Sequence, residues 1–138
     1  MKPAVFSFVR YKFNRSSFDL TNIGPNTSLE MDLHPSGKFL EKKKEFLLQF
    51  DFSAHDEKKR EVVSVTCVAE FKFVNLKSYS DIPEYFYANS IAIVFPYVRA
   101  FISTLTLQAN VSPLVLPTMN LSSLKEMLQQ ATVVCDYE

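Results

Sequence analysis

Two stretches in the middle of the chain alternate between apolar and polar residues with the period of a half-buried β-strand. In the first stretch five residues share one apolar face: Phe46, Leu48, Phe50, Phe52 and Ala54. In the second stretch six residues do so: Val63, Val65, Cys67, Ala69, Phe71 and Phe73. The polar run from His55 to Arg60 between them is short enough to turn the chain back. The pattern therefore predicts an antiparallel hairpin with one buried and one solvated face.

Two earlier segments carry a weaker form of the same alternation. The first, residues 5–14, has four residues on one face: Val5, Val9, Tyr11 and Phe13. Phe18 and Leu20 would prolong this strand past a bulge or kink. The second covers residues 29–33, and the sequence His-Pro-Ser-Gly at 34–37 predicts a turn that closes it. Sequential strands of this kind form one antiparallel sheet, whose apolar face the later elements must cover.

The longest apolar stretch runs from Ser90 to Asn110 and predicts a helix. Eight apolar residues fill its i, i+3, i+4, i+7 rows and overflow onto the flanks: Ile91, Ile93, Val94, Phe95, Val98, Phe101, Ile102 and Leu105. A helix that is apolar on almost all sides lies in a core or in a membrane. We expect a core helix that also meets another subunit, because Pro96 and Arg99 interrupt the ~20 apolar residues that a membrane span needs.

Two segments connect the sheet to the helical part of the chain. Residues 79–87 form the predicted crossover from the sheet to the long helix. Residues 112–119 contain two prolines and are expected to be extended. A second helix is predicted over residues 123–131, started by a capping box between Ser123 and Glu126. Strands that precede helices in this way indicate an α+β fold.

Composition and charge exclude several classes of function. The chain carries 15 Lys and Arg against 15 Asp and Glu, a formal net charge of +0, so charge gives no support for binding nucleic acid or an anionic membrane. Its length suits one domain, 1–138. Cys67 and Cys135 lack C-x-x-C spacing, which favours a reduced cytoplasmic protein, with one disulfide as the alternative. The N-terminal residues have no small-residue cleavage site and are not expected to be a signal peptide.

The residues offer no candidate for catalysis, for a metal or for a cofactor. His34 and His55 are expected in separate loops, without a companion at metal-ligand spacing. Asp51 and Glu70 are expected on the solvated sheet face, where carboxylates are more often hydrated than paired as acid and base. Phosphate-loop, dinucleotide and nucleophile-elbow motifs do not occur. The unusual feature is the aromatic content of 13 Phe and 6 Tyr without Trp. Many of these rings are expected in the core, and rings in excess of what the core can hold would form a binding surface.

One succession of motifs resembles a known family. Phe95-Pro96-Tyr97-x-Arg99 is followed by Ile102, Leu114-x-Leu116 and Asn120-Leu121, which resembles the signature region of the SecB family of bacterial export chaperones. Residues 6–19 are similar to the first strand of that family. The resemblance implies a four-stranded antiparallel sheet with two helices on one face, in agreement with the α+β pattern. It also implies an ATP-independent holdase that keeps preproteins unfolded in the cytoplasm and passes them to the SecA motor.

The aromatic and leucine residues around the long helix suggest a client-binding surface. A groove for extended client segments is expected at seven residues: Tyr79, Tyr85, Phe86, Tyr87, Leu114, Leu116 and Leu121. Such side chains contact apolar segments of many sequences, although they could equally cap the core. The resemblance implies a homotetramer, a dimer of dimers packed through the long helices, with a dimer as the alternative. Its interface is expected at Phe95, Tyr97, Val98, Phe101, Ile102 and Leu105.

The physiological setting stays open at the level of the sequence. Export-type members of the family dock SecA through carboxylates on the exposed sheet face. Asp19 falls near one such position, whereas Arg15 and Val68 fall near positions where an acid is expected. Other SecB-like chaperones stand beside toxin–antitoxin genes and serve one antitoxin. An alternative from another class is an oligomeric adaptor that binds one folded partner through the exposed sheet face.

Overall fold

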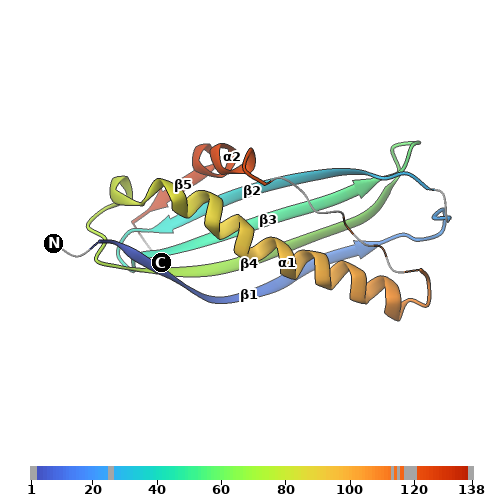
Figure 1. Ribbon diagram of the computed structural model, residues 1–138, viewed down its shortest axis with the longest axis horizontal. Coiled ribbons are helices and arrows are strands. Elements are labelled where there is room, and N and C mark those ends of the chain that lie inside the picture. The colour runs from blue at the N-terminus through green and yellow to red at the C-terminus, as the bar shows by residue number, and fades with distance from the viewer. Residues whose placement is uncertain (1–2, 25–26, 113, 115, 117–120, 137–138) are drawn as a thin grey trace.

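A computed structural model describes residues 3–24, 27–112, 114, 116 and 121–136. Within them, one sheet is covered on one face by two helices (Figure 1). The strands are β1 (Val5–Phe18), β2 (Glu30–Leu40), β3 (Glu45–His55), β4 (Glu61–Val74) and β5 (Thr132–Cys135). The helices are α1 (Glu84–Gln108) and α2 (Leu124–Gln130), with a short 3-10 turn, η1 (Tyr79–Asp81), before α1. The predicted α+β class is confirmed.

The sheet has one strand more than the sequence pattern predicted. Its order is β1-β4-β3-β2-β5, and the first four strands are antiparallel neighbours, as expected. The predicted count of four is wrong because β5 pairs in parallel with β2, opposite Gly37 to Leu40. Residues 132–134 are all β-branched and therefore suit a strand. Because α2 is only seven residues long, it brings them directly to an edge that would otherwise be unpaired.

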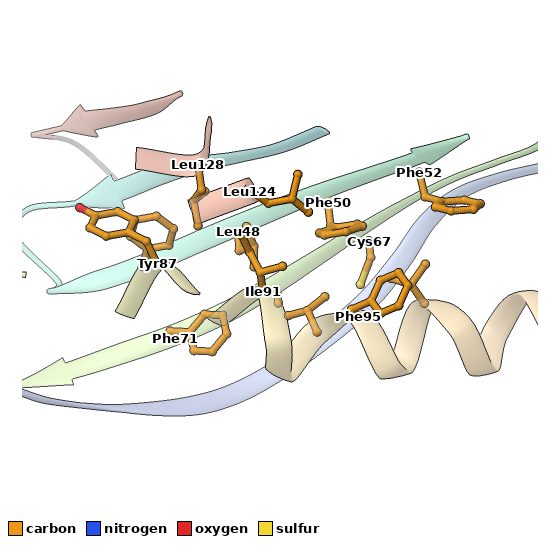
Figure 2. Close-up of a cluster of buried hydrophobic side chains, with 14 of the residues drawn as sticks. Leu48, Phe50, Phe52, Cys67, Phe71, Tyr87, Ile91, Phe95, Leu124 and Leu128 are labelled. Carbon is orange, nitrogen blue, oxygen red and sulfur yellow. The ribbon is translucent and has the colours of Figure 1, made fainter. Parts of the chain in front are cut away.

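The core lies between the sheet and the helices. The predicted β3–β4 hairpin is confirmed, with Phe50 opposite Cys67 in the ladder and both side chains buried. Figure 2 shows Ile91 of α1 and Leu128 of α2 pointing toward this apolar face. Both of these side chains are 0% exposed. Both helices therefore cover the apolar face of the central strands.

Strand β1 departs from the predicted alternation. Val5 and Val9, expected on the buried face, are 49% and 46% exposed. Phe6 and Phe8 pack against the core instead. The register of β1 against β4 shifts between Phe8 and Arg10 and again after Phe13, and such a bulge reverses which residues face inward. The bulge anticipated beyond residue 14 thus has a counterpart earlier in the strand.

The turn predicted at residues 34–37 is wrong, because this segment is the middle of β2. Pro35 pairs with Phe50 and Gly37 pairs with Leu48 of β3. Proline is tolerated in an edge strand, and β5 pairs with β2 only from Gly37 onward. A Cβ on Gly37 would come within 2.8 Å of both the Phe46 ring and the Thr132 hydroxyl. Glycine is therefore present to admit neighbouring side chains rather than to form a turn.

The long helix begins earlier than expected, and the short helix starts differently. Helix α1 starts at Glu84, after Pro83, so the end of the predicted crossover is helical. Helix α2 has the predicted extent, but the capping box is wrong, since Ser123 makes no side-chain capping hydrogen bond. The backbone of Ser123 is itself helical, with φ −68° and ψ −18°, whereas a capping serine needs an extended backbone. Part of the predicted extended segment 112–119 lies outside the described residues.

Among the described residues, α1 is the one helix whose length and apolar composition would allow it to cross a membrane. Core helices of soluble proteins meet the same criterion, so this is weak evidence for a span. In the structure α1 runs obliquely along the sheet (Figure 1) and buries residues along its whole length, from Phe86 to Thr106.

Candidate functional site

The aromatic residues predicted for the client groove divide between surface and core. Tyr85, in the first turn of α1, is 53% exposed. Phe86 and Tyr87 are 0% and 2% exposed, so the structure places them in the core and they do not form a surface that a client could reach. The Phe86 ring packs edge-on against Phe46, with ring centroids 4.8 Å apart. The cause is the early start of α1, which turns two of its first side chains toward the sheet.

The half-buried Tyr79 in η1 packs beside the buried rings at this end of the molecule. Its ring lies 5.8 Å from that of Phe39 at the end of β2. Burial, together with a hydrogen bond to Tyr79, raises the pKa of the Tyr87 hydroxyl. The end of α2 approaches the same region, where the Gln129 side-chain amide donates a hydrogen bond of 3.4 Å to the Glu84 carboxylate. This end of the molecule therefore presents Tyr79 and Tyr85 beside the junction of α1 and α2.

The leucines predicted for the groove lie on the connection between the two helices. Leu116 is 3% exposed and belongs to the core, whereas Leu114 and Leu121 are half-buried and pack against it. The backbone N–H of Leu114 donates a hydrogen bond of 2.8 Å to the hydroxyl of Thr106 in the last turn of α1. The exposed Tyr85 and the hydrogen bond between Thr106 and Leu114 lie at opposite ends of α1, a helix of 25 residues. At about 1.5 Å per residue, the two ends are roughly 30 Å apart.

A second apolar surface joins β1 to the flank of α1. We call it the aromatic trough, a depression of about 240 Å³ lined by Tyr11, Phe13, Tyr97, Ala100, Phe101 and Thr104. The Tyr11 and Tyr97 rings stack with centroids 4.3 Å apart, and both are partly exposed, at 40% and 38%. The sequence pattern places Tyr11 and Phe13 on one face of a strand but does not identify them as part of this surface. The available signal in the sequence was the spacing of these two aromatic residues, because residues i and i+2 of a strand lie on the same face.

The residues predicted for an oligomer interface are also divided. Phe95, Val98 and Ile102 are buried against the protein's own sheet, at 3%, 0% and 0% exposure, so they do not form an outer surface in this structure. Tyr97 is exposed, and Phe101 and Leu105 are half-buried. Helix α1 instead turns outward a face of mostly small or apolar residues: Ala92, Pro96, Ala100, Thr104 and Leu107. The outward face of α1 is therefore formed by other rows of the helix than the buried residues predicted for the interface.

Asp19, the candidate for docking a motor protein, lies exposed just beyond the end of β1. Its carboxylate accepts a 3.1 Å hydrogen bond from the backbone N–H of Thr21. Hydrogen bonds from the Thr21 hydroxyl and backbone lower the pKa of Asp19. The carboxylate is therefore ionised at neutral pH and accessible to solvent, and the residue that donates hydrogen bonds to it, Thr21, belongs to the same local turn.

The described residues contain no group of three or more His, Cys, Asp or Glu side chains arranged to hold a metal. The histidines lie in strands and not in loops as predicted, because β2 and β3 extend through them. His55 lies 3.6 Å from the Asp32 carboxylate on the neighbouring strand. Cys67 and Cys135 are free and buried. The disulfide that the sequence leaves open as an alternative is not formed in this structure.

A hollow of about 280 Å³ lies on the solvated face of the sheet. Its lining includes Leu47 and Val68, which are half-buried, with Lys38 and Gln49 exposed at the rim. Val68 lies near a position where the family resemblance leads us to expect an acid. The hollow is apolar at its base, and it lies on the side of the sheet away from both helices.

Comparisons with known proteins agree with this architecture. The fold is similar to that of the Mycobacterium tuberculosis Rv1957 SecB-like chaperone, solved in complex with a ChAD peptide from the Rv1956 HigA1 antitoxin. That likeness has a TM-score of 0.69 at 11% identity and covers 83% of this chain and 90% of the other. An uncharacterized protein of Methanocaldococcus jannaschii, MJ0357, is 48% identical over 42 residues, which span 30% of this chain and 27% of that protein. The family model described as preprotein translocase subunit SecB matches residues 8–132, and the chain belongs to the SecB family.

Proposed function

We propose that the protein is an ATP-independent holdase that binds extended, unfolded segments of client polypeptides. The observation that carries this proposal is a set of accessible apolar side chains on the helical side of the molecule, which we call the client track: Tyr79, Tyr85, Leu114 and Leu121. Aromatic and leucine side chains provide contact area without demanding one client sequence. Membership of the SecB family supports the same function, and no catalytic step is assigned.

The length of the client track suits an extended segment. Its two ends lie roughly 30 Å apart along α1, and an extended chain covers about 3.3 Å per residue. A client segment of about nine residues would therefore reach from Tyr85 to Leu114. Contacts of this kind are individually weak, and several copies of the track in one oligomer would add their effects through avidity.

The protein is proposed to act as a homo-oligomer, a dimer of dimers, in the cytoplasm. The exposed face of α1 and the adjoining aromatic trough form the surface proposed for self-association. Small side chains such as Ala92 and Ala100 allow two helices to approach closely, and Tyr97 offers an exposed ring at the same face. Aromatic residues of this kind are enriched at protein interfaces. This surface replaces the buried residues named from the sequence.

Two settings are compatible with a holdase of this family. The first is protein export, in which Asp19 would form part of a contact with SecA. The second is protection of one antitoxin, as suggested by the antitoxin peptide bound to the structurally similar mycobacterial chaperone. The two settings differ in client range, because an export chaperone accepts many preproteins and a dedicated chaperone accepts one protein.

A slow-folding client diluted from denaturant tests the proposal. Light scattering is recorded while the protein is titrated in, and suppression should saturate near one client per oligomer. Tyr85→Ala and Leu121→Ala should each weaken client capture several-fold, since each removes roughly 1 kcal/mol of contact. Val74→Ala is the matched control, because Val74 is also 53% exposed but stands on the opposite face of the sheet. Equal loss in the control, or unaltered capture in both track variants, would refute the client track.

An oligomeric adaptor is the second candidate, and the hollow around Leu47 and Val68 favours it. In that case the protein would leave client aggregation unaffected at several-fold excess. It would form a stoichiometric complex with one folded partner, and Leu47→Asp would abolish that complex. Suppression of aggregation by the Leu47→Asp variant at the level of the unaltered protein would instead support the holdase.

A further inference from the structure

Thr106 is one of the few polar residues buried in the described part of the chain, at 1% exposure. Its hydroxyl oxygen lies 3.1 Å from the carbonyl oxygen of Ile102 and 3.0 Å from that of Ser103. It also lies 2.8 Å from the backbone nitrogen of Leu114. A hydroxyl has one proton to donate and two lone pairs, so Thr106 donates to the helix carbonyls and accepts from Leu114.

The bond from Leu114 distinguishes this threonine from an ordinary helical one. Threonine hydroxyls commonly bond back to the preceding turn of their own helix, and such bonds position nothing outside it. Leu114 is eight residues further along, beyond the end of α1. The Thr106 side chain therefore joins the helix to the connection that carries the three leucines predicted for client binding.

The chain between these two residues is built to reverse its direction. Asn110 has a positive φ of 62°, the left-handed conformation in which helices commonly end. The backbone N–H of Val111 donates a 3.3 Å hydrogen bond to the carbonyl of Thr106. The backbone carbonyl of Thr106 thus binds Val111, where the chain turns back, and the side-chain hydroxyl of Thr106 binds Leu114 three residues later. A single residue of the helix therefore makes both hydrogen bonds to the connection.

We propose that Thr106 is a positioning residue for client binding, because it fixes the place of Leu114 at one end of the client track. The inference rests on the proposed holdase function. Loss of the hydroxyl would leave the Leu114 N–H without this acceptor in a partly buried site, and the connection would open to let water reach it. A client would then have to order the connection again on binding, which weakens its affinity.

The test compares Thr106→Val with Thr106→Ser. Valine keeps the branched shape and removes the hydroxyl, whereas serine keeps the hydroxyl and removes only the methyl group. Amide hydrogen exchange at Leu114, measured by NMR without any client, should be roughly tenfold faster in Thr106→Val and close to the original rate in Thr106→Ser. A net hydrogen bond corresponds to roughly 2- to 12-fold in such an equilibrium. The dissociation constant for an unfolded fluorescent client should rise by a similar factor in Thr106→Val alone.

The outcomes separate this inference from the proposed function. If hydrogen exchange at Leu114 is unchanged in Thr106→Val, the Thr106 hydroxyl does not hold Leu114 in place, and the proposal is overturned. If exchange is faster but the affinity for the client is unchanged, Thr106 does not position Leu114 for client binding. Failure of the unaltered protein to bind any unfolded client refutes the holdase and the positioning role with it. If Thr106→Val does not fold, exchange in the unaltered protein decides the matter. An unprotected Leu114 amide there overturns the proposal, and a protected amide that slows further with client supports it.

Discussion

The Phe13 ring on β1 lies parallel to the Phe101 ring on α1, with centroids 4.0 Å apart and planes inclined by 7°. The neighbouring pair of Tyr11 on β1 and Tyr97 on α1 is also stacked, with ring centroids 4.3 Å apart. Together these two contacts tie the edge strand of the sheet to the long helix. They also form the walls of the aromatic trough, so the same rings contribute to stability and to the surface proposed for self-association.

The Phe13–Phe101 contact should appear as a coupling energy in a double-mutant cycle. Phe13→Leu, Phe101→Leu and the double variant are compared by urea unfolding. Stacked rings contribute about 0.5–1.5 kcal/mol beyond the apolar area that they bury, and we expect a coupling free energy in that range. The control cycle combines Phe13→Leu with Phe39→Leu, which lies on β2 toward the other edge of the sheet. Equal coupling in both cycles would contradict a direct contribution from the stacked pair.

Gly37→Ala should destabilise the fold, while Gly24→Ala should not. A Cβ on Gly37 would stand 2.8 Å from both a Phe46 ring carbon and the Thr132 hydroxyl. Overpacking of this kind typically costs about 1–3 kcal/mol of unfolding free energy. Among the described residues, the Cβ of Gly24→Ala would meet only the Thr27 hydroxyl, at an ordinary 3.7 Å. Chemical denaturation of the two variants checks this, and equal midpoints would show that Phe46 and Thr132 move aside without cost.

The two buried thiols should report separately on the edge and the centre of the sheet. Burial raises the pKa of Cys67 to about 11, so its thiol stays protonated at neutral pH and reacts slowly. Cys135 lies in β5, which pairs with β2 at four positions only. Short edge elements open locally more easily than central strands.

A thiol-specific reagent applied to the variants Cys67→Ala and Cys135→Ala therefore has a definite expected result. The Cys67→Ala variant, which retains Cys135, should be labelled faster under native conditions than the Cys135→Ala variant. Adding Gly37→Ala should accelerate the labelling of Cys135 further, since Gly37 pairs with Thr132. Identical labelling rates for the two thiols would mean that β5 opens only when the whole fold unfolds.

Asp56 should give the protein an acid-sensitive component of stability. Its carboxylate accepts hydrogen bonds of 2.9 Å from the backbone N–H groups of Lys58 and Arg60 and one of 2.7 Å from Arg60 Nε. These bonds, led by the one from the Arg60 backbone, lower the pKa of Asp56 below its ordinary value. The folded state therefore binds fewer protons than the unfolded state in the acid range.

The sign of the pH effect follows from that lowered pKa. The contribution of Asp56 is complete above the ordinary pKa of an aspartate and is lost as the pH falls through the lowered value of the folded state. Asp56→Asn should reduce stability at neutral pH and flatten its decline toward acid. Glu57→Gln, at an exposed position of the same turn, removes the same charge as a control. A parallel decline in Asp56→Asn and the unaltered protein would contradict the assignment.

Much of the fold follows from local patterns in the sequence. The β3 and β4 hairpin could be predicted because strict alternation over many residues leaves only one choice of buried face. The extent of α2 was also predictable, although its expected capping bond does not form. The family signature around Phe95 and Leu114 indicated the architecture and the class of function. Even so, it could not tell which of its side chains reach the surface.

The errors arise where distant neighbours override local preference. His-Pro-Ser-Gly resembles a turn, yet pairing with β3 on one side and β5 on the other draws Gly37 into a strand. Phe86 resembles the exposed Tyr85 beside it, yet the rotation of α1 on the sheet buries one ring and exposes the other. The missed residues, Tyr11 and Thr106, acquire their roles through partners on other elements, Tyr97 and Leu114.

The sequence by itself determined the α+β class, the buried faces of the central strands and the family, because these depend on periodicity and on motifs within short segments. Only the tertiary structure decided which apolar residues remain exposed. That outcome depends on the bulges in β1, the start and rotation of α1, and the docking of β5. Each of these is set by packing between segments that are far apart in the chain, where a shift of one residue exchanges a buried side chain for an exposed one.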